Sequence, residues 1–196
     1  MPQTIRTFIA LELPASIIEL LDNVQQEIKS LALRARWVRT ENIHLTLRFL
    51  GDIDPGHVDR IDEAIHKAAE GFAPFTLALK GVGFFPGIKR PRVIWAGLGG
   101  QIRLLIQLQR KLADSLAAIG FPNEKRPFKG HLTLGRIREA VNPDTIRQVI
   151  EIYSDLGSEE FTVGRVALFQ SDLKPTGAVY TRLRTTTFKQ VAAGDS

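Results

Sequence analysis

The tetrapeptide His-Leu-Thr-Leu occurs twice in this chain of 196 residues, beginning at His44 and again at His131, 87 positions later. The chain has only four histidines, so two of the four lie in these identical tetrapeptides. Alternate side chains of a strand share one face, so His44 projects with Thr46 and His131 projects with Thr133, while the leucines face the core. If the two strands face each other, two imidazoles and two hydroxyls meet at one place.

Such a group of side chains fits displacement at a cyclic phosphodiester. One imidazole takes a proton from the attacking water and the other gives a proton to the departing sugar oxygen, since histidine titrates near neutral pH. Threonine hydroxyls donate hydrogen bonds to phosphoryl oxygens. The alternative is that both tetrapeptides are core strands whose histidines are hydrogen-bonded in the interior. The duplication in matching local contexts favours the functional interpretation.

Hydrophobic periodicity predicts the elements that must position these residues. Strands are expected at 4–13, 37–38, 43–50, 75–85, 93–98, 131–134, 161–170 and 178–188, and helices at 14–28, 55–71, 102–119 and 143–153. A turn is expected at Lys174-Pro175-Thr176-Gly177. This order favours an α+β fold of two pseudo-symmetric lobes, each an antiparallel sheet with helices packed on its outer face, enclosing a central cleft. We expect residues 1–196 to form a single bilobal domain.

Composition sets limits on location and partners. The chain is 44% hydrophobic and 24% charged, contains no cysteine and has no run of about 18 apolar residues, which excludes disulfides and disfavours secretion and membrane insertion. We therefore expect a cytoplasmic protein and a monomer. A net charge of +5 is a weak indication of a polyanionic partner. No zinc, calcium or dinucleotide-binding pattern is present, so no metal or nucleotide cofactor is predicted.

The chain resembles the 2H phosphoesterase superfamily, and within it the RNA 2',3'-cyclic phosphodiesterases, also called 2'-5' RNA ligases. The resemblance is carried by segments spread over nearly the whole chain, at residues 6–11, 37–52, 81–86, 91–97, 128–136 and 171–180.

This resemblance implies hydrolysis of RNA 2',3'-cyclic phosphate ends to 2'-phosphate ends, with tRNA halves among the candidate substrates and 2'-5' ligation as the reverse reaction. It implies that His44 donates a proton to the leaving oxygen and that His131 is the base that activates water. Thr46 and Thr133 would hold the phosphate, together with an arginine at the position of Arg136.

Two arginines near the motifs raise questions of side-chain direction. Strand alternation turns Arg136 away from His131 and Thr133 unless the strand ends or bulges at Gly135, and a solvated strand end is the alternative. Arg48 shares a face with His44 by the same alternation, which makes it a candidate phosphate contact.

Further candidates lie in the segments that carry the resemblance or beside the second motif. Aromatic rings often stack on RNA bases, although aromatic residues in strands are more often core, and we favour the core for each ring here. Basic side chains can approach the RNA backbone or be merely solvated. The candidates for substrate binding are Phe8, Phe84, Phe85, Trp95, Arg92 and Lys129.

Two other functions remain open. One is a phosphodiesterase that acts on small cyclic nucleotides, because related enzymes process small molecules. The other is a non-catalytic module that binds RNA ends, with the histidines as ligand contacts.

Overall fold

The computed structural model describes residues 4–175 and 177–189, which form two antiparallel sheets and four α-helices. The strands are β1 (Ile5–Leu11), β2 (Arg36–Trp37), β3 (Leu45–Ile53), β4 (Phe75–Phe85), β5 (Val93–Gly100), β6 (Leu132–Arg136), β7 (Phe161–Val163), β8 (Arg165–Lys174) and β9 (Gly177–Thr187). The helices are α1 (Ala15–Ser30), α2 (Val58–Ala69), α3 (Ile102–Ala117) and α4 (Pro143–Ile152), with short 3₁₀ turns η1 (Thr40–Asn42) and η2 (Pro55–His57). The predicted α+β class is confirmed. Thr176, in the predicted turn between β8 and β9, lies outside the described residues.

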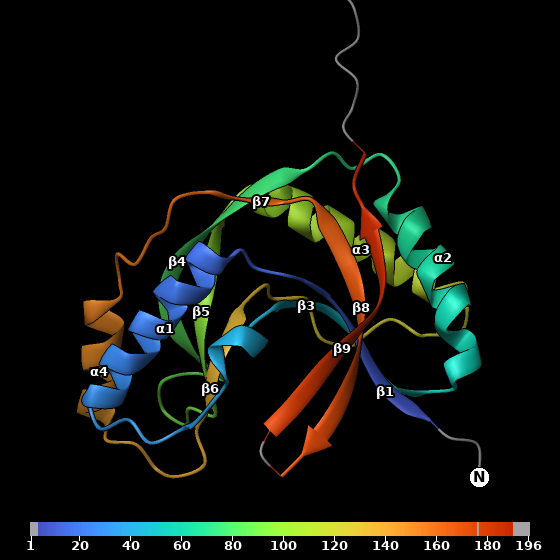
Figure 1. Ribbon diagram of the computed structural model, residues 1–196. Coiled ribbons are helices and arrows are strands. Elements are labelled where there is room, and N and C mark those ends of the chain that lie inside the picture. Colours follow the sequence, from blue (N-terminus) through green and yellow to red (C-terminus); the bar gives the residue numbers. More distant parts are fainter. Residues whose placement is uncertain (1–3, 176, 190–196) are drawn as a thin grey trace, which may run out of the picture.

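One sheet has the strand order β3-β1-β8-β9 and the other has the order β2-β6-β5-β4-β7. Helices α2 and α3 pack on each other, with α2 against β9 and α3 against β3. Helix α4 packs against β4, and α1 is hydrogen-bonded to β6 through Gln25. The helices therefore lie on the outer sides, and the helix-free faces of the two sheets are turned toward the middle of the molecule (Figure 1).

The chain crosses between the two sheets, so a sequence half is not a lobe. Helix α1 follows β1 of the first sheet but packs on the second, and α3 follows β5 of the second sheet but packs on the first. Strand β4 of the first half likewise joins the second sheet, while β8 of the second half joins the first. Each sheet therefore contains strands from both halves of the chain, so the two motif strands belong to one folded unit.

Local sequence explains where the helices begin. Pro143 is the first residue of α4, where the missing N–H is not needed and the fixed φ suits the first turn, and Pro14 immediately precedes α1. The Asn142 side chain also accepts a hydrogen bond from the Asp144 N–H at 2.9 Å. The buried positions of α3 recur at helical spacing and are all leucines: Leu105, Leu108, Leu112 and Leu116.

One predicted strand is divided in the structure. Residues 161–170 were expected to form a single strand, but Gly164 separates β7 in the second sheet from β8 in the first. The carbonyl oxygen of Gly164 accepts a hydrogen bond from the Phe188 N–H at 2.8 Å. The expectation of one continuous strand is wrong, because the chain leaves the second sheet after Val163 and enters the first sheet at Arg165.

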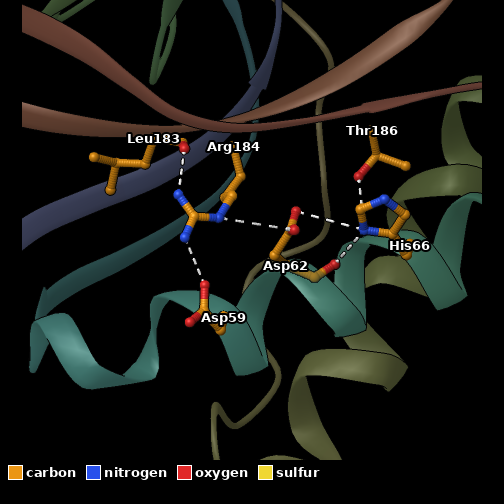
Figure 2. A network of polar contacts seen from close by, with 6 residues as sticks. All are labelled: Asp59, Asp62, His66, Leu183, Arg184 and Thr186. Atoms are coloured by element: carbon orange, nitrogen blue, oxygen red, sulfur yellow. Dashed lines mark hydrogen bonds and ion pairs between the residues drawn. The ribbon is translucent and has the colours of Figure 1, made fainter.

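A polar network ties α2 to β9 (Figure 2). The Arg184 Nη2 donates to Asp59 Oδ1 at 2.6 Å, and its Nε lies 4.0 Å from Asp62 Oδ2. His66 Nδ1 lies 2.9 Å from the Asp62 carbonyl oxygen and 3.3 Å from the Thr186 hydroxyl. Most of these side chains are exposed, so the network adds little stability to the packing of the apolar face of α2. Across the described ranges, no helix combines the length and apolar character needed to cross a membrane.

Candidate active site

Both motif strands carry a register shift at the same position of the motif. In β3, Ala10 is paired with Thr46 and Ile9 with Arg48, so Leu47 has no partner of its own. In β6, Trp95 is paired with Thr133 and Ile94 with Gly135, so Leu134 is passed over in the same way. A bulge of this kind leaves two successive residues on one face and reverses the alternation beyond it. The internal repeat is thus a structural repeat, in which Phe49 and Arg136 occupy equivalent positions.

The two histidines are held by the same local hydrogen bond. The Nδ1 of His44 lies 2.8 Å from the Asn42 carbonyl oxygen, and the Nδ1 of His131 lies 2.7 Å from the Lys129 carbonyl oxygen. A carbonyl oxygen only accepts, so each Nδ1 carries the hydrogen and donates it. Each Nε2 takes no part in this hydrogen bond and can exchange a proton with a ligand. Neither imidazole is fully buried.

His44 lies in an aromatic group on the helix-free face of the first sheet. Its ring stacks on Phe8 with a centroid distance of 4.6 Å and meets Tyr180 edge to face at 5.2 Å. Burial lowers the pKa of His44 below its usual 6.5, and the hydrogen bond to the Asn42 carbonyl opposes this shift. The Asn42 amide is itself fixed, because it donates to the Ala178 carbonyl at 2.9 Å.

His131 has a different aromatic support. Phe85 meets the imidazole edge to face with a centroid distance of 5.0 Å, and Trp95 lies 4.9 Å behind Phe85. The Lys129 ammonium lies 5.8 Å from the Phe85 ring centroid. The indole of Trp95 covers Gly83, where a Cβ would come within 2.3 Å of the ring. A glycine is therefore required for the indole to lie flat on the sheet beneath Phe85.

Arg136 connects the two motif regions. The bulge at the second motif turns Arg136 away from the buried side of β6, and its side chain is exposed. Such a bulge is the condition under which strand alternation lets Arg136 share a face with His131 and Thr133. Burial raises the pKa of the Tyr180 hydroxyl, while the positive charges of Arg136 and Arg6 oppose this shift. Tyr180 also contacts His44, so Arg136 of the second sheet lies in the electrostatic neighbourhood of the first motif. The charge of Arg136 therefore links the second sheet electrostatically to the surroundings of the first motif.

Arg48 differs from the sequence expectation. The bulge in β3 reverses its direction relative to His44, so that it is buried with 6% of its side chain exposed. Its Nη2 donates to the Pro122 carbonyl oxygen, and its Nη1 lies 3.7 Å from Glu124 Oε1. Arg48 therefore fastens β3 to the loop that precedes the second motif, and the expectation that it shares a face with His44 is wrong.

The remaining candidates separate into two groups. Phe8 and Phe85 contact the histidines, and Trp95 supports Phe85. Phe84 is 5% exposed within the main hydrophobic core, in agreement with the core interpretation. Arg92 is exposed, and the structure gives its side chain no contact with these rings.

Sequence reasoning did not single out Tyr180, Arg6 or Asn42. Tyr180 and Arg6 lie at the ends of segments that carried the family resemblance, which was the available signal for them. Asn42 could have been found from its spacing, because it stands two residues before His44 as Lys129 stands two residues before His131. Within residues 4–175 and 177–189, no three His, Cys, Asp or Glu side chains are grouped so that they could hold a metal ion.

Comparisons with known proteins agree with this fold. The chain matches the LigT-like phosphoesterase family over residues 11–95 and 99–180, and it belongs to that family. A protein of Methanothermobacter thermautotrophicus named RNA 2',3'-cyclic phosphodiesterase is 31% identical over 90% of this chain and 95% of its own. One of the same name from Thermotoga maritima is 34% identical over 89% of this chain and 91% of its own.

Solved structures give the same relationship. The crystal structure of E. coli LigT complexed with 3'-AMP superimposes with a TM-score of 0.77 and 27% identity, over 96% of this chain and all of that one. The phosphate complex of the same protein has a TM-score of 0.74 at 27% identity, over 96% of this chain and 99% of that one. The expected relationship to the 2H phosphoesterases is confirmed.

Proposed function

We propose that this protein hydrolyses RNA 2',3'-cyclic phosphate ends to 2'-phosphate ends by metal-independent acid–base catalysis with His44 and His131. The observation that carries the proposal is the matched pair of imidazoles, each fixed through Nδ1 with Nε2 left for a ligand. The names of the relatives support the substrate class. The proposal includes action as a single bilobal domain, as a monomer and in the cytoplasm.

In the proposed reaction, the His131 Nε2 removes a proton from a water molecule whose oxygen attacks phosphorus. The bond from phosphorus to the 3' oxygen breaks, and the His44 Nε2–H donates its proton to that oxygen. The products are a 2'-phosphate and a 3'-hydroxyl. A 5'-hydroxyl of a second RNA in place of water gives a 2'-5' phosphodiester by the same proton transfers, which accounts for 2'-5' ligation. Thr46, Thr133 and Arg136 hold the phosphoryl oxygens by donating hydrogen bonds.

The protonation state of His44 makes the acid role depend on substrate. Its pKa is lowered mainly by burial, so in the free protein the ring is predominantly neutral at pH 7. A proton donor must carry the proton, and the negative charge of a bound cyclic phosphate raises the pKa of a nearby imidazole. His44 therefore takes up its proton as the substrate binds, and the rate should fall at both acidic and alkaline pH.

The test is hydrolysis of an oligoribonucleotide with a 2',3'-cyclic phosphate end in the presence of excess chelator. His44→Ala and His131→Ala should each lower kcat by about 100-fold to 10,000-fold, and the double variant should lose little more, because the two groups act as a unit. His57→Ala is the matched control, since His57 is exposed and belongs to neither motif. Failure of the wild-type protein to open the ring, or unchanged rates in both single variants, overturns the proposal.

A further inference from the structure

The short strand β2 breaks the symmetry between the two sheets. It lies beside β6, so the second motif strand has a neighbour on both sides, whereas β3 forms the edge of its own sheet. The pairing sets Arg36 opposite Arg136 and Trp37 opposite Gly135. The extra strand thus places a second guanidinium next to the one beside the second motif.

Strand β2 is firmly fixed. The buried Gln25 amide of α1 donates to the Val38 carbonyl at 2.9 Å and to the Leu134 carbonyl at 3.0 Å, which fastens the end of β2 to β6. A Cβ on Gly135 would lie 3.2 Å from Trp37, and the Lys29 ammonium of α1 lies 5.5 Å from the Trp37 ring centroid. Trp37 therefore faces the helix side of the sheet.

Arg36 must then project to the opposite face, because successive side chains of a strand alternate. Residues that are directly opposite on neighbouring strands share a face, so Arg36 and Arg136 stand side by side on the helix-free face. Both are exposed, and no carboxylate of residues 4–175 or 177–189 forms an ion pair with either. Two like charges opposite each other are unfavourable by themselves, and a bound anion removes that cost.

We propose that Arg36 binds the phosphodiester preceding the terminal nucleotide of the RNA, so that a chain of at least two nucleotides is preferred to a cyclic mononucleotide. This inference rests on the proposed function. Neighbouring strands are about 4.8 Å apart. When Arg136 holds the terminal phosphate, the side chain of Arg36 can therefore reach the next phosphate group along the RNA. Guanidinium suits this ligand because its planar donors match two phosphate oxygens.

The experiment compares the cyclic mononucleotide 2',3'-cyclic AMP with the dinucleotide ApA that ends in a 2',3'-cyclic phosphate. Arg36→Gln should lower kcat/KM for the dinucleotide about tenfold and leave that for the mononucleotide within about twofold. A dinucleotide with an uncharged methylphosphonate linkage should be insensitive to the substitution. The salt dependence of kcat/KM for the charged dinucleotide should weaken by about 0.7 in logarithmic slope. Arg147→Gln is the matched control, as this exposed arginine of α4 is paired with Asp144.

Equal losses on both substrates would overturn the inference, because Arg36 would then act at the terminal phosphate. No loss on either substrate would overturn it as well. Turnover of 2',3'-cyclic AMP by the wild-type protein tests the proposed function separately. If neither substrate is hydrolysed, the affinities for ApA with a 2'-phosphate and for 2'-AMP still test Arg36. Arg36→Gln should then weaken binding of the dinucleotide about tenfold and leave binding of 2'-AMP within about twofold.

Discussion

Replacing Gly83 by alanine tests whether the support beneath His131 matters for catalysis. A Cβ at this position would lie 2.3 Å from Trp95 Cζ2 and 2.6 Å from Cη2. Gly83 does not have a positive φ, so alanine can adopt its backbone conformation and the perturbation is steric. The indole must therefore move, and Phe85 and the imidazole of His131 rest on it in turn.

The size of the effect follows from the distances. Tolerable contact begins near 3.4 Å, so the indole must retreat by about 1.1 Å. Overpacking of this kind lowers the free energy of unfolding by about 1 to 3 kcal/mol. A catalytic group displaced by about 1 Å loses up to about 100-fold in rate, so transmission through Phe85 should lower kcat by about 10-fold to 100-fold.

The assay is urea unfolding together with turnover of 2',3'-cyclic AMP at saturating substrate. Gly99→Ala is the matched control, because its Cβ would only come to 3.6 Å from Lys80 in the same sheet. The chain has two tryptophans, so a Trp37→Phe background lets Trp95 fluorescence report the ring movement directly. A destabilised Gly83→Ala protein with the wild-type kcat would refute the argument that the indole positions His131. Equal loss of activity in Gly99→Ala would refute it too.

Other expectations follow from single residues. By NMR, the pKa of His44 should lie below 6.5 in the free protein and rise when inorganic phosphate is bound. The free energy of unfolding should fall as the pH drops below 6.5, because His44 then binds a proton more readily in the unfolded chain than in the folded one. Arg136→Gln should lower kcat/KM by about 10-fold to 100-fold, whereas Arg48→Gln should chiefly lower the melting temperature. If kinetics and calorimetry instead showed that Arg136→Gln mainly affects stability and Arg48→Gln mainly affects activity, the proposed site would be contradicted. Arg184→Gln should cost less than about 1 kcal/mol in urea unfolding, since its ion pairs with α2 are exposed, and a larger loss would contradict this estimate.

Much of the fold could be predicted because local patterns and global packing agree. β4 begins and ends at the predicted residues Phe75 and Phe85, and α3 begins at the predicted Ile102. The repeated tetrapeptide also predicted two equivalent strands, since a motif of four residues carries both the core leucines and the polar face. These features depend on side chains close together in sequence.

The rest depends on contacts between distant segments. Nothing in residues 15–30 says that α1 packs on the sheet opposite to the one containing β1, because its apolar face would suit either sheet. The bulge at Leu47 could not be predicted from the sequence either. Because of it, Arg48 is not a candidate phosphate contact but is buried and hydrogen-bonded to the Pro122 carbonyl in the loop. Alternation rules predict directions correctly only as far as the register is regular.

Under the proposed mechanism, the departures from symmetry explain how two identical motifs take different roles. Two imidazoles in the same surroundings would be interchangeable, yet the reaction needs one donor and one acceptor. The structure keeps the hydrogen bond to Nδ1 the same in both motifs and changes what lies next to each ring. His44 lies between Phe8 and Tyr180, and the position equivalent to Phe49 in the other motif carries Arg136. In the mechanism proposed above, Arg136 orients the phosphate from one side, so that one imidazole faces the leaving oxygen and the other faces the incoming water.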